Sequence, residues 1–333
     1  MEAIIAPADP AKCAADIVRL WNACLGKAFP MDERLFRQQT SLERDDYLLL
    51  AARREPEEPL NGAILVKRAT RKDEKGTVPD TGYISFILTT PGARGKGMGS
   101  RLLEEAEAWC ARRGVRTIIA GSDYCHFFPG LPLDDSSLSA SAISFFSKRG
   151  YRQGQVEMDM IADLALLDLR LPRDGGFSCL GYRFSLCSPS LRPAALAFLS
   201  RCFPGRWESE ISEAFSASMR DEDLGLAIRE TDDAVVGFAR IGDRGSPLLW
   251  PGLYWRGLLG ASPGSLGPIG IDPACRGLGL GLDLLRASLA ELKRRGVRNT
   301  VIDWTDLEDF YAKLGFVPWK RYRGMIKSLN AKS

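Results

Sequence analysis

The sequence has 333 residues, 45% of them apolar and 26% charged, and a formal charge of +3 from 45 Lys and Arg against 42 Asp and Glu. This length predicts two domains, because single cores stop growing at about 250–300 residues. The near balance of charge disfavours nucleic acid and anionic membranes as partners. No apolar run reaches the roughly 18 residues that a membrane span needs, and no signal peptide is evident at the N-terminus. We therefore expect a cytoplasmic protein.

Hydrophobic patterning in the first half predicts alternating strands and helices. The expected strands are residues 3–6, 47–53, 60–68, 83–89 and 115–120, and the expected helices are residues 10–24, 32–39 and about 102–112. A glycine-rich loop at residues 91–99 separates a strand from the helix after it.

The second half repeats this order. The expected strands are residues 182–186, 224–230, 234–243, 266–271 and 297–303, and the expected helices are residues 190–202 and a leucine-rich one that ends at Gly296. The alternation predicts a mixed α/β fold.

Two short motifs show that the chain contains two copies of one unit. Residues 91–99 (PGARGKGMG) return 182 residues later as residues 273–281 (PACRGLGLG), and residues 145–151 return 165 residues later as residues 310–316. The first copy therefore holds 17 more residues between these motifs. We expect domains at residues 1–168 and 177–333, joined by a linker at residues 169–176 that contains proline, paired glycines and charges.

Cysteine and histidine usage argues against metal and triad chemistry. The eight cysteines include no C-x-x-C pair, and His126 is the single histidine. Zinc sites and nucleophile triads require clustered thiolates or imidazoles. No metal is predicted, and His126 is interpreted as structural.

The repeated glycine-rich loops predict an anion site. Each loop lies between a strand and a helix, where the free N–H groups of the first helical turn attract negative charge. Alternate glycines allow positive φ angles, so that the backbone can wrap a phosphate. The G-x-G-x-G spacing fits neither the dinucleotide fingerprint nor a P-loop.

Both copies resemble the GNAT superfamily of acyl-CoA-dependent N-acyltransferases. Residues 94–99 and 276–281 match its signature [RQ]-x-x-G-x-[GA], and residues 142–151 and 307–316 match its later signature. The resemblance implies two tandem domains, each with a mostly antiparallel, splayed central sheet flanked by helices.

The resemblance also implies that acetyl-CoA binds in the gap of the splayed sheet. Pantetheine would bond to the backbone at Ile87, Thr89, Ile269 and Ile271. The pyrophosphate would bind Arg94, Gly95, Lys96, Gly97, Met98, Gly99 and Ser100 in copy 1, and Arg276, Gly277, Leu278, Gly279, Leu280, Gly281 and Leu282 in copy 2.

Copy 2 is favoured as the catalytic copy. The family commonly uses a tyrosine of the later signature as proton donor to the departing thiolate. Copy 2 has Tyr311 there and copy 1 has Phe146. Asp303 is the nearest acidic candidate for a base, although a base is dispensable if the amine arrives neutral.

The acceptor is expected on the side of the gap opposite the coenzyme. The extra residues of copy 1 offer Phe127 and Phe128 as pocket walls and Asp134 as partner for a cationic amine, and Trp304 adds an aromatic wall in copy 2. An equally weighted interpretation makes the extra segment a longer connector packed on the neighbouring domain.

The sequence thus predicts an N-acetyltransferase that acts directly on a small-molecule primary amine, as a monomer or homodimer. The alternative is a non-catalytic protein that binds acyl-CoA.

Overall fold

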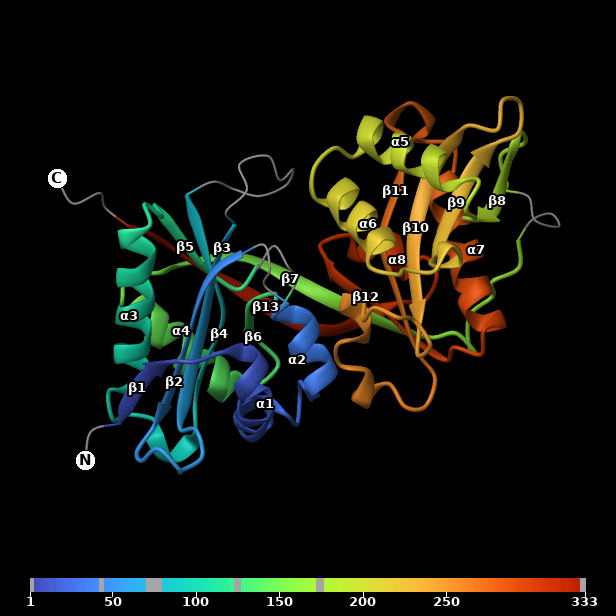
Figure 1. Cartoon of the computed structure of the whole chain (residues 1–333). Coiled ribbons are helices and arrows are strands. Elements are labelled where there is room, and N and C mark those ends of the chain that lie inside the picture. Colours follow the sequence, from blue (N-terminus) through green and yellow to red (C-terminus); the bar gives the residue numbers. More distant parts are fainter. Residues whose placement is uncertain (1–2, 42–44, 70–79, 123–126, 172–176, 330–333) are drawn as a thin grey trace. The chain divides into compact units, whose positions relative to one another are not determined.

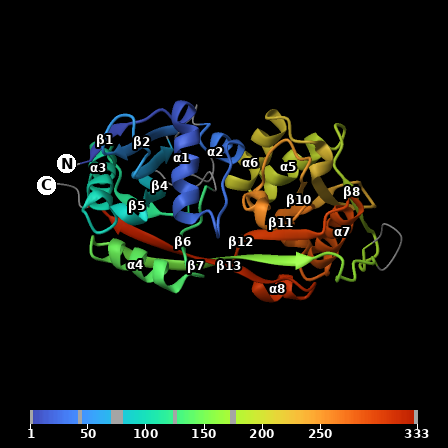
Figure 2. The same ribbon diagram turned by 90° about the horizontal axis from the view of Figure 1, so that it is seen from below.

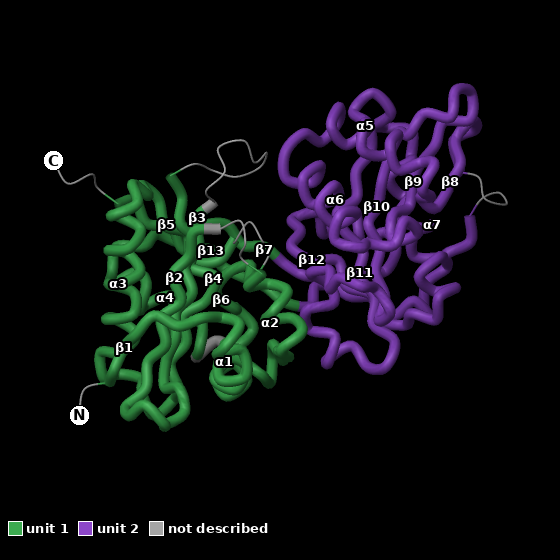
Figure 3. The backbone as a smooth tube through the Cα atoms, in the orientation of Figure 1, with its two compact units in different colours: residues 1–73, 77–157, 320–333 green, residues 74–76, 158–319 purple. Residues whose placement is uncertain are grey.

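The computed structural model describes residues 3–41, 45–69, 80–122, 127–171 and 177–329. They form two compact units, which are coloured separately in Figure 3. Unit 1 comprises the described residues up to 157 together with those from 320 onward, and unit 2 comprises residues 158–319. Among the described residues, no helix has the length and apolar character that crossing a bilayer requires.

Unit 1 has a sheet covered by helices on both faces (Figures 1 and 2). Its strands are β1 (Ile4–Pro7), β2 (Asp45–Arg53), β3 (Gly62–Ala69), β4 (Thr81–Thr89), β5 (Thr117–Ala120) and β6 (Leu131–Pro132), with parts of β7 (Arg152–Asp163) and β13 (Val317–Ser328). Its helices are α1 (Pro10–Leu25), α2 (Glu33–Gln39), η1 (Pro91–Ala93), α3 (Met98–Arg112) and α4 (Ser136–Ser147). Residues of α3 and α4 share one core with the strands, and α1 packs on the opposite face.

Unit 2 repeats this plan. Its strands are β8 (Tyr182–Leu186), β9 (Leu224–Arg229), β10 (Val235–Asp243), β11 (Pro263–Ile271) and β12 (Asn299–Thr305). Its helices are α5 (Arg192–Cys202), α6 (Arg206–Ser216), η2 (Asp221–Asp223), η3 (Pro251–Leu253), η4 (Arg256–Leu258), η5 (Pro273–Cys275), α7 (Leu280–Arg294) and α8 (Glu308–Ala312). Helix α6, which the sequence analysis did not predict, buries Ile211, Ala214 and Phe215.

In the described part of each unit, the sheet splits where two neighbouring strands run parallel. In unit 1, β4 pairs with β5 from Thr81 to Ile84; beyond Ile84 it stays paired with β3 up to Thr89, but not with β5. In unit 2, β11 pairs with β12 from Pro263 to Ser265 and continues to Ile271. On their other edges these four strands pair antiparallel with β10, β7, β13 and β3. The predicted splayed, mostly antiparallel sheet is therefore confirmed in both units.

The last strand of each copy joins the sheet of the other unit. Strand β13, at the end of copy 2, pairs with β5 in unit 1 from Met325↔Ala120 to Ser328↔Thr117. The second half of β7, at the end of copy 1, pairs with β12 in unit 2. The compact units thus divide the chain differently from the sequence repeats at 1–168 and 177–333. The unit to which β7 and β13 belong is decided by the strands with which they pair, and not by their order along the chain.

Candidate active site

The two glycine-rich loops have the backbone geometry that an anion site needs. In the first loop, Gly95 and Gly97 have φ angles of 73° and 84°, and in the second, Gly277 and Gly279 have 83° and 80°. A Cβ atom built on any of these four glycines would meet nothing within 4 Å. Each loop thus combines a left-handed backbone, which favours glycine, with open space beside it.

The loops also leave N–H groups available. Within the described residues, no backbone hydrogen bond uses the N–H groups of Gly95, Lys96 or Gly97, or those of Gly277, Leu278 or Gly279. The next N–H groups along the chain are those of the first turns of α3 and α7. Such N–H groups have no acceptor inside their own helix. Leu282 is an exception among the predicted contacts, because its N–H donates to the Gly279 carbonyl at 3.1 Å.

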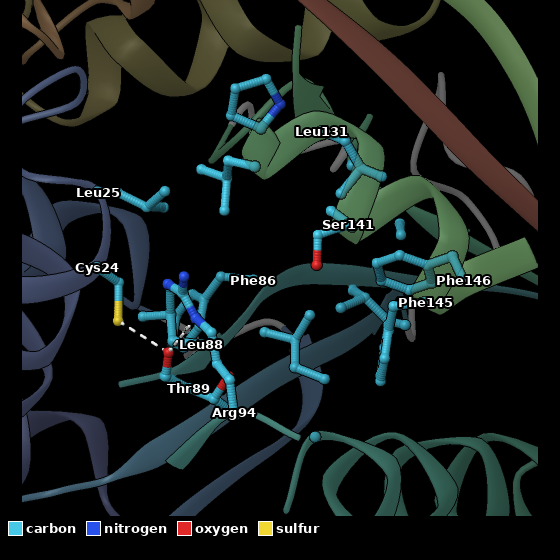
Figure 4. A pocket seen from close by; sticks show the side chains of 18 of the residues that line it. Cys24, Leu25, Phe86, Leu88, Thr89, Arg94, Leu131, Ser141, Phe145 and Phe146 are labelled. Carbon is cyan, nitrogen blue, oxygen red and sulfur yellow. Dashed lines mark hydrogen bonds between the residues drawn. The ribbon is translucent and has the colours of Figure 1, made fainter. Parts of the chain in front are cut away.

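In unit 1 the loop opens into a cavity of about 520 Å³. Figure 4 shows Cys24 and Leu25 on one side of it and Ser141, Phe145 and Phe146 of α4 on the other. Of the predicted coenzyme contacts in copy 1, the cavity is lined by Ile87, Thr89, Arg94, Gly95, Gly97, Gly99 and Ser100. Lys96 is outside this lining, and its Nζ donates to the Gly92 carbonyl at 2.8 Å. Met98 is outside it too and is buried.

Described residues of the extra segment of copy 1, among them Gly130, Leu131 and Pro132, line this cavity. The N–H of Ser122 donates to the Pro129 carbonyl at 2.9 Å, and β6 pairs with β13 at Tyr322 and Arg323. A Cβ atom on Gly121 would lie 2.4 Å from the Cα of Gly130. The described part of the segment therefore packs directly over the end of β5.

Aromatic rings fill the interior behind this segment. Phe127 packs against Trp21 and Phe86 with ring centroids 5.8 and 5.6 Å apart, and Phe128 packs against Trp21, Phe29 and Tyr322. Phe128 lines the cavity, whereas Phe127 does not. The exposed Asp134 accepts a hydrogen bond from the backbone of Arg321 at 3.4 Å. Phe127, Phe128 and Asp134 thus belong to unit 1, whereas the predicted catalytic pair, Asp303 and Tyr311, belongs to unit 2. His126 lies outside the described residues.

Tyr311 and Asp303 both lie in unit 2, where the sheet splits. Asp303 is on β12, two residues beyond the last pairing with β11, and its Oδ1 is buried. Burial raises the pKa of Asp303 to about 6, while the nearby charge of Arg240 acts in the opposite direction. Tyr311, on α8, is buried and hydrogen-bonded to the Thr305 side chain, and burial raises its pKa well above the usual value of 10. This arrangement provides a carboxylate and a protonated phenol near neutral pH.

Charged and aromatic groups surround the Asp303 carboxylate. The backbone N–H of Trp304 donates to Oδ1 of Asp159 at 3.0 Å. The guanidinium of Arg206 lies 4.7 Å from the centre of the Trp304 ring. Glu210 pairs with Arg206 at 2.6 Å along α6 and with Arg240 of β10 at 3.5 Å. Arg206, Glu210 and Arg240 were not among the site residues predicted from the sequence. A position-by-position comparison of the copies would have found Arg240, because copy 1 has Leu65 at the matching register.

The sequence profile of the acetyltransferase (GNAT) family matches residues 14–127 and 192–316, one match in each copy. The chain belongs to the GNAT acetyltransferase family. A mycothiol acetyltransferase from Geodermatophilus obscurus is 29% identical over 260 residues, which cover 71% of this chain and 73% of that protein. As a member of this family the protein is an acetyltransferase, and the family generally uses acetyl-CoA.

Solved structures confirm the tandem GNAT fold. A GCN5-related glucosamine N-acetyltransferase region of a fungal multi-domain β-N-acetylglucosaminidase has a TM-score of 0.83 at 24% identity; the match covers 98% of this chain but only 38% of that protein's length. A tandem GNAT protein from the clavulanic acid biosynthesis pathway has a TM-score of 0.69 at 16% identity, with both chains fully covered. A GNAT protein from Sphaerobacter thermophilus has a TM-score of 0.67 at 20% identity and covers 98% of this chain and 95% of its own.

Proposed function

We propose that this chain is an acetyl-CoA-dependent N-acetyltransferase that passes the acetyl group directly to a primary amine of a small molecule, with the reaction in unit 2. One observation carries the proposal: Tyr311 and Asp303 occur together in unit 2, where copy 1 has Phe146 and Gly121 at the matching positions. Only unit 2 thus combines a phenol donor and a carboxylate acceptor at these positions.

In this proposal both glycine-rich loops bind the coenzyme diphosphate. The available N–H groups and the open space beside the glycines fit a phosphate group. Arg94 and Arg276 add positive charge beside the loops. Beyond Ile84 and Ser265, the unpaired edges of β4 and β11 offer backbone groups to pantetheine, at Ile87 and Thr89 in unit 1 and at Ile269 and Ile271 in unit 2.

The transfer needs no enzyme nucleophile. The neutral amine attacks the thioester carbonyl carbon and forms the C–N bond while Asp303 accepts the proton that the nitrogen loses. The C–S bond then breaks as Tyr311 donates its proton to the departing sulfur. The phenolate regains a proton from solvent, and the protonated Asp303 releases its proton to solvent. The products are the amide and CoA thiol. General acid help of this kind typically contributes about 10²–10⁴-fold to the rate.

The small-molecule acceptor is supported by two relatives, which are named for mycothiol and for glucosamine. In unit 2, Trp304 offers a partly exposed ring beside Asp303 as a wall for such an acceptor. In this proposal unit 1 binds a CoA ester without turning it over, because Phe146 and Gly121 stand where unit 2 has the phenol and the carboxylate.

The test is chromatographic measurement of CoA released from acetyl-CoA with a panel of amines that includes glucosamine, other amino sugars, cysteine amides and polyamines. Native mass spectrometry of the same protein counts bound coenzymes. We expect CoA release with at least one amine and an acetylated product of matching mass. Coenzyme binding without CoA release across the panel would favour the non-catalytic acyl-CoA-binding alternative.

A further inference from the structure

A buried arginine lies beside the proposed base in unit 2. Arg240, on β10, is only 4% exposed. Its Nε donates to the Gly267 carbonyl at 2.7 Å, its Nη1 lies 3.5 Å from Oε2 of Glu210, and its guanidinium stacks 4.4 Å from the centre of the Trp250 ring. Burying such a cation is unfavourable unless nearby groups compensate its charge. The position therefore calls for an explanation beyond packing.

Copy 1 shows that the fold does not require this charge. Gly62 pairs with Thr89 and Gly237 pairs with Ile271, so these glycines occupy the same register in the two copies. Three residues further along their strands are Leu65 in copy 1 and Arg240 in copy 2. Leu65 is fully buried. Unit 1, which has Gly121 and Phe146 at the matching positions, thus has the apolar Leu65. Unit 2, which has Asp303 and Tyr311, has Arg240.

Gly267 connects Arg240 to Asp303. The carbonyl of Gly267 accepts the Arg240 hydrogen bond, and a Cβ atom built on Gly267 would lie 3.4 Å from Oδ1 of Asp303. The strand register of β10 and β11 shifts at this point, between Ala239 and Ile241, which places Arg240 at the irregularity. The guanidinium and the carboxylate thus share one short piece of β11 backbone at the split in the sheet.

We propose that Arg240 is a positioning residue for the acetyl transfer: it fixes the Gly267 backbone beside the reacting groups and supplies the buried positive charge that balances the Asp303 carboxylate. This inference rests on the proposed function, because it concerns the same site. The ionisable groups near Asp303 and Tyr311 come from four elements and from the residue after β12. They are Arg240 on β10, Glu210 and Arg206 on α6, Asp159 on β7, Thr305-bound Tyr311 on α8, and Asp306 after β12.

Two substitutions with opposite expected effects on the pH dependence of kcat/KM test whether the charge of Arg240 acts on the Asp303 carboxylate. If Asp303 is the base, we expect kcat/KM to show an acidic limb near pH 6. Arg240→Met removes a charge that favours the carboxylate, so the limb moves to higher pH, by about one unit. Glu210→Gln removes a charge that disfavours it, so the limb moves to lower pH. Arg240→Lys keeps the charge but not the guanidinium fork, so the limb stays near the wild-type position while kcat falls.

A purely structural role gives a different result. If Arg240→Met lowers kcat without moving the limb, or if both substitutions move it in the same direction, the proposal is wrong.

A second measurement separates this inference from the proposed function. A carboxyl whose folded pKa exceeds its unfolded value makes the free energy of unfolding fall as pH rises from about 4 to 6. Urea unfolding across this range, with Asp303→Asn as reference, reports Asp303 without any turnover. We expect Arg240→Met to extend the fall to higher pH. A wild type that shows this fall but releases no CoA at any pH contradicts the proposed function alone, and an Arg240→Met profile equal to wild type contradicts the inference alone.

Discussion

At the scale of single residues, the two copies differ where protons would move. Phe146 and Tyr311 occupy the same position of the later motif, and both are buried. Both pack edge-on against a neighbouring phenylalanine, Phe145 or Phe310, at centroid distances of 5.3 and 5.0 Å. The surrounding aromatic packing is therefore conserved between the copies, and the hydroxyl is the difference that matters for chemistry.

This difference predicts the effect of Tyr311→Phe. Because the substitution keeps the ring and its packing, we expect stability to change little and kcat to fall by about 10²–10⁴-fold. Steady-state CoA release and thermal unfolding measure the two effects. Tyr151→Phe is the matched control, because Tyr151 is also a buried tyrosine but belongs to unit 1. A Tyr311→Phe enzyme with the wild-type kcat would remove the phenol from the mechanism.

At the scale of elements, substitutions in the glycine-rich loops test which unit must bind the coenzyme for turnover. Valine at Gly97 or Gly279 would strain a backbone with positive φ and place a side chain in the open space beside the loop. Strain of this kind costs about 1–3 kcal/mol. We expect Gly279→Val to abolish turnover, and Gly97→Val to reduce the bound coenzyme from two to one per chain while turnover persists.

Native mass spectrometry with CoA counts the occupied sites, and CoA release measures turnover. Gly92→Ala is the control, because Gly92 also faces open space but its φ lies outside the positive range. Loss of turnover in Gly97→Val with Gly279→Val still active would place the chemistry in unit 1.

Local motifs explain why much of this site could be predicted. The loops are short and repeated, so the sequence predicts correctly that Arg94 and Arg276 lie in loops between a strand and a helix. The later motif is also repeated, so the sequence matches Tyr311 with Phe146 but does not predict α8. The Arg240 environment depends on which residues of β10 and β11 face each other, and this register includes an irregularity that periodicity does not show. The course of residues 127–132 depends on contacts with β13, almost 200 residues further along the chain.

At the scale of the whole molecule, the exchanged strands link the two copies. Unit 1 depends on β13, in which Tyr322 and Met325 are fully buried, and on an ion pair between Lys327 and Glu107 at 2.6 Å. Alternating patterns within each copy predict strands but not their partners, so the boundaries at residues 168 and 177 describe the repeats and not the packed units.

The strand exchange predicts what happens when the chain is shortened. A stop codon after Trp319 would remove the part of β13 that belongs to unit 1 and expose the edge of β5. Losing the two buried side chains costs about 5 kcal/mol or more, which is comparable to the whole stability of a domain. We therefore expect the described strands of unit 1 to lose protection in hydrogen-exchange mass spectrometry, with β9 and β10 of unit 2 less affected.

A chain that ends after Leu329 keeps all of β13 and serves as the control. Tyr322→Ala in the full-length protein offers an intermediate case, since it leaves the backbone pairing with β5 in place while removing one buried ring. Exchange at Ile118–Ala120 should then rise in the order of control, Tyr322→Ala and the chain that stops at Trp319, because these backbone groups pair directly with Met325–Lys327. Equal protection of β5 in all three proteins would mean that unit 1 does not need the strand from the end of the chain.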